Sequence, residues 1–254
     1  MLEILLIVGV LFLIFTFFYK QAVCEFRINQ AEWTQKEKIP DLLGEKIPLV
    51  VRSIPTASFW TQQDVLERPC FENIPIFRET SLTNWLTTSD ANSVCPWKYP
   101  QAETIAQASG LKIWAEKWMN PSIIHPFLKW WISPKYHCWA GKVGLRKTFA
   151  TWTCLFPVDG ELTVTIMPEN VESSLPSNWP GCFPSELTAK DTPFVNDLKF
   201  IDIILRPGNC LFMPAHWFVS WTPTESSEKS PMACTISYHT PISLLAFHAS
   251  PHNK

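Results

Sequence analysis

Residues Arg206 to Trp221 read RPGNCLFMPAHWFVSW, and this decisive stretch gives the strongest indication of the fold. Pro207 and Gly208 predict a turn, because proline fixes φ and glycine tolerates a positive φ. The apolar run that follows is too short for a helix and is interrupted by Pro214, so it predicts two short buried strands with a corner between them. Such strands are typical of a barrel or a sandwich.

The sequence on both sides of this stretch also predicts strands. Residues 162–166 read LTVTI, a clean alternation that follows the turn at Asp159-Gly160. Further apolar runs at 148–157, 200–205 and 232–238 predict three more strands. The loop at 170–197 is rich in Pro and Ser, and a loop of this length in a compact domain is expected to cover or contact something.

Two helices are expected upstream of these strands. The first covers 102–119, with Gly110 as its weak point. The second begins at Asn120-Pro121 and is expected to turn four apolar residues towards the core, namely Ile124, Phe127, Leu128 and Trp131. With these helices preceding the strands, the domain is expected to be mainly β with accessory helices.

The composition describes one principal domain with an aromatic core. The chain has 254 residues, 46% of them hydrophobic, with 13 Trp, 22 Pro and only 8 Gly. These proportions favour an irregular, mostly β fold over a helical bundle or a disordered chain. The net charge of -2 gives no overall reason to expect nucleic acid as a partner.

The N-terminus carries an apolar run from Ile4 to Tyr19. As a helix it nearly crosses the hydrocarbon core of a bilayer, which is about 30 Å thick. A secretory signal peptide is the main alternative, but no Lys or Arg precedes the run and a good cleavage site is missing after it. A buried core helix is less favoured, because the run has no polar face. We therefore expect a retained single-pass anchor that contacts membrane lipid through residues 4–19.

The residues after the anchor predict its orientation. Lys20, Arg27, Lys36 and Lys38 follow the apolar run, which places the C-terminal part on the cytosolic side or on an equivalent side, such as the matrix side of the mitochondrial inner membrane. The eight cysteines form no Cys-x-x-Cys pair and indicate buried thiols in a reducing compartment.

Several motifs resemble the cupin-like (JmjC-type) family of 2-oxoglutarate oxygenases. The family's Pro-Gly-Asp turn and Leu-Phe-Ile-Pro strand are matched by Pro207-Gly208-Asn209 and by residues 211–214. Its opening Pro-Val-Val-Ile-Arg strand resembles residues 48–52, and its Trp-Ile-Gly resembles Trp139-Ala140-Gly141. The resemblance implies a double-stranded β-helix, or jelly roll, and an iron site of two histidines and a carboxylate beside a lysine for 2-oxoglutarate.

The positions that would hold iron and 2-oxoglutarate do not match the family. Counting back from Gly160, the family's His-x-Asp falls on Lys147 and Phe149, and its lysine falls on Leu162. The third ligand position is Val219. Apolar side chains offer no donor to a metal and would fill the barrel instead. The resemblance therefore implies a pseudoenzyme with no catalytic residue, no metal and no cofactor.

Two other groups of residues are candidates for a functional role. A site built from His216, His239 and Asp159 in another geometry is the alternative for an active oxygenase. A basic, Trp-rich stretch offers a candidate interface for anionic lipid or an acidic partner. Alternatively, its tryptophans belong to the core and its lysines are simply solvated. Its members are Lys129, Trp130, Trp131, Lys135, Lys142 and Arg146.

The sequence thus predicts a transmembrane helix at 1–19, a juxtamembrane linker at 20–46, a cupin/JmjC-like domain at 47–247 and a tail at 248–254. The expected function is a non-catalytic accessory or structural subunit of a membrane-associated complex, for example a respiratory-chain assembly. A non-standard iron oxygenase and a viral capsid protein that links to a membrane are the alternatives. Other protein subunits are the expected partners, with no nucleic acid and no small-molecule substrate.

Overall fold

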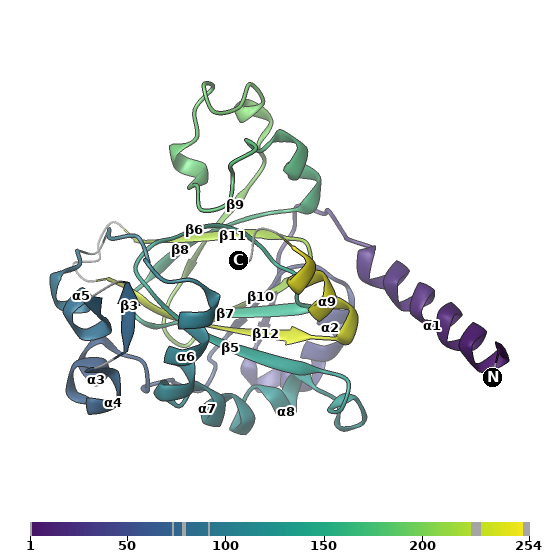
Figure 1. Ribbon diagram of the computed structural model, residues 1–254, viewed down its shortest axis with the longest axis horizontal. Coiled ribbons are helices and arrows are strands. Elements are labelled where there is room, and N and C mark those ends of the chain that lie inside the picture. Colours follow the sequence, from purple (N-terminus) through teal and green to yellow (C-terminus); the bar gives the residue numbers. More distant parts are fainter. Residues whose placement is uncertain (1, 73, 78–79, 91, 225–229, 251–254) are drawn as a thin grey trace.

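Two β-sheets face each other at the centre of the molecule (Figure 1). The computed structural model describes residues 2–72, 74–77, 80–90, 92–224 and 230–250. The six-stranded sheet contains, in sheet order, β1 (Asn29–Glu32), β2 (Leu49–Arg52), β10 (Cys210–Pro214), β7 (Trp152–Asp159), β12 (Met232–His239) and β5 (Ser133–Ala140). The four-stranded sheet contains β6 (Val143–Lys147), β11 (Phe218–Pro223), β8 (Leu162–Met167) and β9 (Ile201–Leu205).

Neighbouring strands in both sheets are antiparallel, except that β1 and β2 are parallel. The fold is therefore mixed α/β with antiparallel sheets, an arrangement consistent with a cupin-like fold. The decisive stretch forms β10 and β11, as expected from its sequence. The corner between them lies at Ala215 to Trp217, where His216 adopts a left-handed backbone with φ of 71°.

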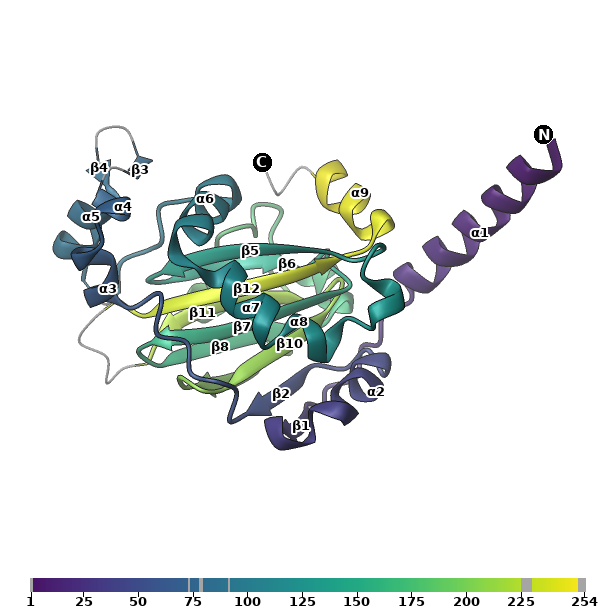
Figure 2. The same cartoon turned by 90° about the horizontal axis from the view of Figure 1, so that it is seen from below.

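Helices cover the outer face of the six-stranded sheet (Figures 1 and 2). They are α6 (Tyr99–Ser109), α7 (Leu111–Lys117) and α8 (Asn120–Ile123). A second group of short elements packs at the opposite end of the barrel from the N-terminal helix. This group comprises α3 (Gln62–Glu67), α4 (Pro69–Glu72), β3 (Pro75–Phe77), β4 (Thr80–Ser81) and α5 (Leu82–Thr88).

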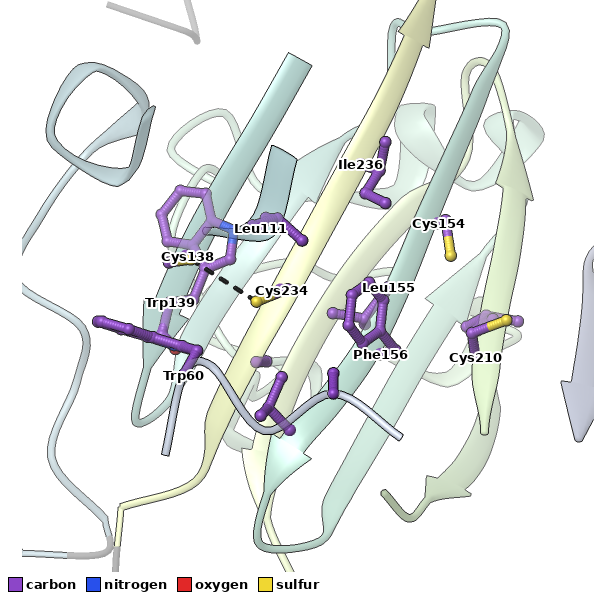
Figure 3. Packing of buried hydrophobic residues seen from close by; sticks show 14 of the residues in the cluster. Trp60, Leu111, Cys138, Trp139, Cys154, Leu155, Phe156, Cys210, Cys234 and Ile236 are labelled. Atoms are coloured by element: carbon purple, nitrogen blue, oxygen red, sulfur yellow. Dashed lines mark hydrogen bonds between the residues drawn. The ribbon is translucent and has the colours of Figure 1, made fainter. Parts of the chain in front are cut away.

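The core lies between the sheets and beneath these helices (Figure 3). All eight residues of β12 are buried, because the strand has neighbours in the sheet on both sides and layers on both faces. Trp60 reaches in from the loop before α3 and donates its indole N–H to the Trp139 carbonyl at 3.1 Å. Cys138 and Cys234 face each other across β5 and β12, with their sulfur atoms 3.6 Å apart. Burial of these large side chains is the main stabilising contribution.

The Pro- and Ser-rich loop at 170–197 packs on the outer face of the four-stranded sheet. It contains the 3-10 turns η3 (Glu169–Ser174), η4 (Pro184–Glu186) and η5 (Val195–Asp197). Val171, Leu175 and Trp179 from this loop form a separate buried cluster with Leu145 and Phe218 of the sheet. The expectation that this loop covers another part of the chain is met by this cluster.

The upstream helices differ from the sequence prediction. The expected helix at 102–119 is divided into α6 and α7, because Gly110 takes a left-handed conformation with φ of 91°. The second helix, α8, ends at Ile123, and Pro126 then begins the turn η2 (Pro126–Leu128). As a result Phe127 is exposed rather than buried, with 80% of its surface accessible, so its expected inward orientation is wrong.

The stretch expected to be a juxtamembrane linker contributes to the domain. Within residues 20–46, β1 pairs with β2, and η1 (Trp33–Lys38) leads into α2 (Ile39–Gly44), which buries Ile39 and Leu43. At the other end, α9 (Pro241–Ala249) continues past residue 247 into the expected tail. Residues 251–254 of that tail lie outside the described residues.

The N-terminal helix α1 (Leu2–Lys20) projects away from the barrel (Figures 1 and 2). Its window Glu3–Lys20 has a mean hydropathy of 2.1 and none of it is buried. By length and composition this helix fits either a membrane anchor or a signal sequence.

Candidate functional site

A small cavity lies inside the barrel between β6, β11 and β12. Val219 pairs with Arg146 across β11 and β6, and both side chains face this cavity. Its volume is about 30 Å³, room for about one or two water molecules. The walls include Tyr99, Trp139, Arg146, Phe149, Val219, Ser237, His239 and Phe247.

Arg146 supplies the positive charge in this cavity. Its guanidinium carbon lies 4.2 Å from the centre of the Trp139 ring and 5.0 Å from that of Tyr99. Stacking on two aromatic faces stabilises a cation without a carboxylate partner. Among the described residues, no Asp or Glu lines the cavity. The interior is thus apolar and cationic rather than purely hydrocarbon.

Two buried histidines lie on or beside the cavity wall. Burial is the main cause that lowers the pKa of His137 to about 3; His239, when it is protonated, and the charge of Arg146 lower it further. Burial also lowers the pKa of His239 to about 4, with Lys135 contributing. The imidazole Nδ1 atoms lie 3.5 Å from the Thr235 hydroxyl and 3.3 Å from the Ser243 hydroxyl, respectively. Both rings are therefore neutral at pH 7 and have hydroxyl rather than carboxylate neighbours.

The four positions counted from the family pattern are only partly brought together. Phe149 and Val219 line the cavity. Lys147 contributes to the same wall, but its ammonium points outside the barrel to Glu172 and Glu169, at 2.7 and 3.2 Å. Leu162 pairs with Pro223 at the far end of β11 from Val219, so it lies in the core away from the cavity.

These residues do not fit an iron site. Phe149 and Val219 have no donor atoms, and the Lys147 ammonium is engaged by two carboxylates. Within the described part of the chain, no group of three His, Cys, Asp or Glu residues is placed to hold a metal ion. The volume of the cavity is also well below the roughly 300 Å³ at which ligand pockets begin.

The alternative site of His216, His239 and Asp159 does not assemble. Asp159 pairs with Met232 at one end of β12, whereas His239 is at the other end of that strand. A strand of this length separates the two side chains by about 23 Å. His216 lies at the corner after β10, where it contacts α1.

The C-terminal end of α1 is fixed to the barrel beside the cavity. The Tyr19 hydroxyl donates to the Phe149 carbonyl at 2.7 Å, and the ring of Tyr19 packs on His216 with centroids 4.8 Å apart. Nε2 of His216 lies 3.2 Å from the Tyr19 carbonyl. The Lys46 ammonium donates to the carbonyls of Phe18 and Gln21. The last carbonyls of the helix are thus satisfied by side chains of the domain.

The basic, Trp-rich stretch is divided among different places. Trp131 packs against Phe15 of α1, with ring centroids 5.6 Å apart, and Trp130 packs on Trp131. Lys129 lines a different groove, beside α6, α7 and α8. Lys135 pairs with Glu103 at 3.0 Å on the outer face of β5. Lys142 lies beyond the other end of β5, and Arg146 is inside the barrel. Spacing in the sequence did not reveal that Arg146 is an interior residue, since its strand register was unknown.

Comparisons with known proteins gave limited matches. No family model matches the chain, and no curated protein matches it. Among solved structures, 40% of the chain aligns with the Drosophila melanogaster CENP-C cupin domain at 12% identity and a TM-score of 0.26, covering 57% of that chain. The alignment with hydroxypropylphosphonic acid epoxidase from S. wedmorenis covers 42% of each chain, with 11% identity and a TM-score of 0.27. The chain therefore spans about half the length of these structures.

Proposed function

We propose that this chain is a membrane-anchored, non-catalytic protein whose cupin-like barrel serves as an accessory or structural subunit of a membrane-associated complex. The observation that carries this proposal is the docking of α1. Its apolar surface projects away from the domain, while its C-terminal end is fixed by Tyr19, Lys46 and His216. A helix that is only a cleaved signal would have no need of such contacts.

The barrel interior supports the non-catalytic part of the proposal. An iron oxygenase needs imidazole and carboxylate ligands on one face of the mouth, with space for a co-substrate. Phe149, Val219 and the stacked guanidinium of Arg146 occupy that place in this chain. These groups favour a packed barrel that offers its outer surfaces to other subunits.

The residues after α1 support a cytosolic or matrix-like location for the barrel. Lys20, Arg27, Lys36 and Lys38 follow the apolar run that ends at Tyr19, and such basic residues are usual on the cytosolic side of an anchor. All eight cysteines are free thiols, and five of them are buried. This pattern is compatible with a reducing compartment.

Extraction of the full chain in mild detergent, followed by purification and identification of bound proteins, tests the proposed function. We expect the chain to migrate in a complex with other subunits, and the purified protein to take up neither Fe(II) nor 2-oxoglutarate in titrations. Migration of the chain alone would contradict the accessory role. Stoichiometric uptake of iron together with 2-oxoglutarate would contradict the non-catalytic role.

A further inference from the structure

A short loop beside α1 exposes an unusual group of large apolar side chains. In residues 125–130 every side chain is exposed, and Phe127 and Trp130 each have 80% of their surface accessible. Leu128, between them, is 46% exposed. Contiguous apolar groups of this kind on a soluble surface usually mark a contact with a partner or with a membrane.

The position of this loop relative to α1 identifies the partner. Trp131, the next residue, packs against Phe15 of α1, with ring centroids 5.6 Å apart. Phe15 lies five residues before Lys20, which corresponds to about 7.5 Å along the helix axis. If α1 spans a bilayer with Lys20 at the headgroup level, Trp131 is held at the boundary between headgroups and acyl chains. This step rests on the proposed membrane anchor.

A groove between α1 and the loop opens at the same depth. Its volume is about 540 Å³, and one of its walls is the spanning helix itself. Most of the lining side chains are apolar, among them Phe15, Phe18, Leu43, Leu128, Trp131 and Ile242. Because an apolar groove of this size would be costly to leave in water, acyl chains are the matching occupant at this depth.

We propose that the 125–130 loop is a second membrane contact, in which Phe127 and Trp130 insert at the boundary of the bilayer and phospholipid acyl chains fill the groove beside α1. Tryptophan favours this boundary, because its ring is apolar and its N–H is polar. Lys129 lies between the inserted residues in the sequence and is exposed, and lysine side chains near a bilayer favour the headgroup region. Together with α1, the loop restricts the tilt of the barrel on the membrane surface.

Quenching of a site-specific fluorophore by spin-labelled phosphatidylcholine tests this contact in the full chain. The fluorophore is attached at Trp130→Cys in a background of Cys24→Ser, Cys70→Ser and Cys182→Ser, and the protein is held in phosphatidylcholine nanodiscs. Two further sites are labelled in the same way. Leu13→Cys reports on α1, and Val94→Cys is the matched exposed control.

Val94 is a suitable control because it bridges to Lys142, beyond the opposite end of β5 from Ser133 and the loop. We expect lipid to quench the labels at positions 13 and 130 strongly and the label at 94 little. Quenching at 13 with none at 130 would overturn the second contact and leave the anchor intact. Absence of quenching at both 13 and 130 would overturn the loop contact and the anchor together.

Discussion

At the scale of single residues, the barrel interior combines neutral imidazoles with one stacked guanidinium. His137 and His239 are kept uncharged mainly by burial, and the positive charges near them act in the same direction. Arg146 is the cation that Trp139 and Tyr99 stabilise from their ring faces. The family resemblance implies two histidines and a carboxylate as iron ligands. In this chain, side chains that pack against one another occupy the barrel interior.

Stability should depend on pH through these two histidines. Their folded-state pKa values of about 3 and 4 lie below the usual 6.5, so the unfolded chain binds more protons than the folded chain below pH 6.5. The stabilisation is complete above pH 6.5 and is lost as the pH falls. We expect the free energy of unfolding to decrease by about 2 kcal/mol per histidine between pH 7 and pH 5.

Urea unfolding of the detergent-solubilised chain at the two pH values measures this effect. His137→Asn should remove about half of the pH dependence contributed by the two histidines, because His239 still titrates. His125→Asn is the matched control, since His125 is exposed. Equal pH dependence in the wild type and the His137 variant would show that His137 is not held neutral by the fold.

Residue-scale features were only partly accessible from the sequence. The absence of ligand residues at Phe149 and Val219 could be read from the motif spacing alone. The inward orientation of Arg146 could not, because a shift of one residue in register exchanges the two faces of a strand. Leu162 was placed with the others by counting along the chain, but it lies at the far end of its strand pair.

At the scale of elements, the loop over the four-stranded sheet depends on one close backbone approach. A Cβ atom at Gly144 would clash with the carbonyl oxygen of Gly181. The Gly181 N–H donates to the Leu145 carbonyl at 2.9 Å, and the Leu145 N–H donates to the Cys182 carbonyl at 2.7 Å. Glycine at 144 therefore lets the loop bind to β6 like an additional strand segment.

Gly144→Ala should destabilise the domain by about 1 to 3 kcal/mol, because the backbone of the loop must move away from β6. Gly44→Ala is the control, since a Cβ atom there meets no neighbour within 4 Å. Thermal unfolding and hydrogen exchange of residues 179–182 measure the two effects. A Gly144 variant that unfolds and exchanges like the Gly44 variant would contradict this account of the contact.

The docking of α1 is a second property of elements. Tyr19→Phe combined with Lys46→Met removes the donors to the carbonyls of Phe149, Phe18 and Gln21. The helix should then sample a wider range of angles relative to the barrel, because these unmade hydrogen bonds cost about 1 kcal/mol each. Spin labels at positions 13 and 94 should give a broader distance distribution in this variant.

Thr16→Val is the matched control for that experiment. The Thr16 hydroxyl donates to the Phe12 carbonyl at 2.8 Å, a hydrogen bond within the helix. Its removal should leave the distance distribution unchanged. If both variants broaden the distribution equally, the hydrogen bonds of Tyr19 and Lys46 do not determine the orientation of the helix.

Element prediction succeeded where local patterns are strong. The decisive stretch at 206–221 and the alternation at 162–166 formed the expected strands. The pattern was only partly right at 120–131, where α8 ends after a single turn: Ile124 is buried as expected, but Phe127 and Leu128 are exposed. Sequence patterns also missed β1, because a short half-exposed edge strand has little hydrophobic periodicity and depends on its pairing with β2.

At the scale of the whole molecule, a projecting apolar helix is joined to a packed barrel through the contacts of Tyr19, Lys46 and His216. The groove and the exposed loop lie at this junction, whereas α3, α4 and α5 lie at the opposite end (Figure 2). A bilayer around α1 would therefore meet one end of the barrel and leave the other end free for protein partners.

The central claim is that α1 stays on the mature chain and spans the membrane. Its most direct test is alkaline extraction of membranes from the native source, followed by measurement of the intact mass of the chain. The account predicts that the chain remains in the membrane pellet with residues 2–20 still attached. A chain that is released into the supernatant and begins after Lys20 would contradict it.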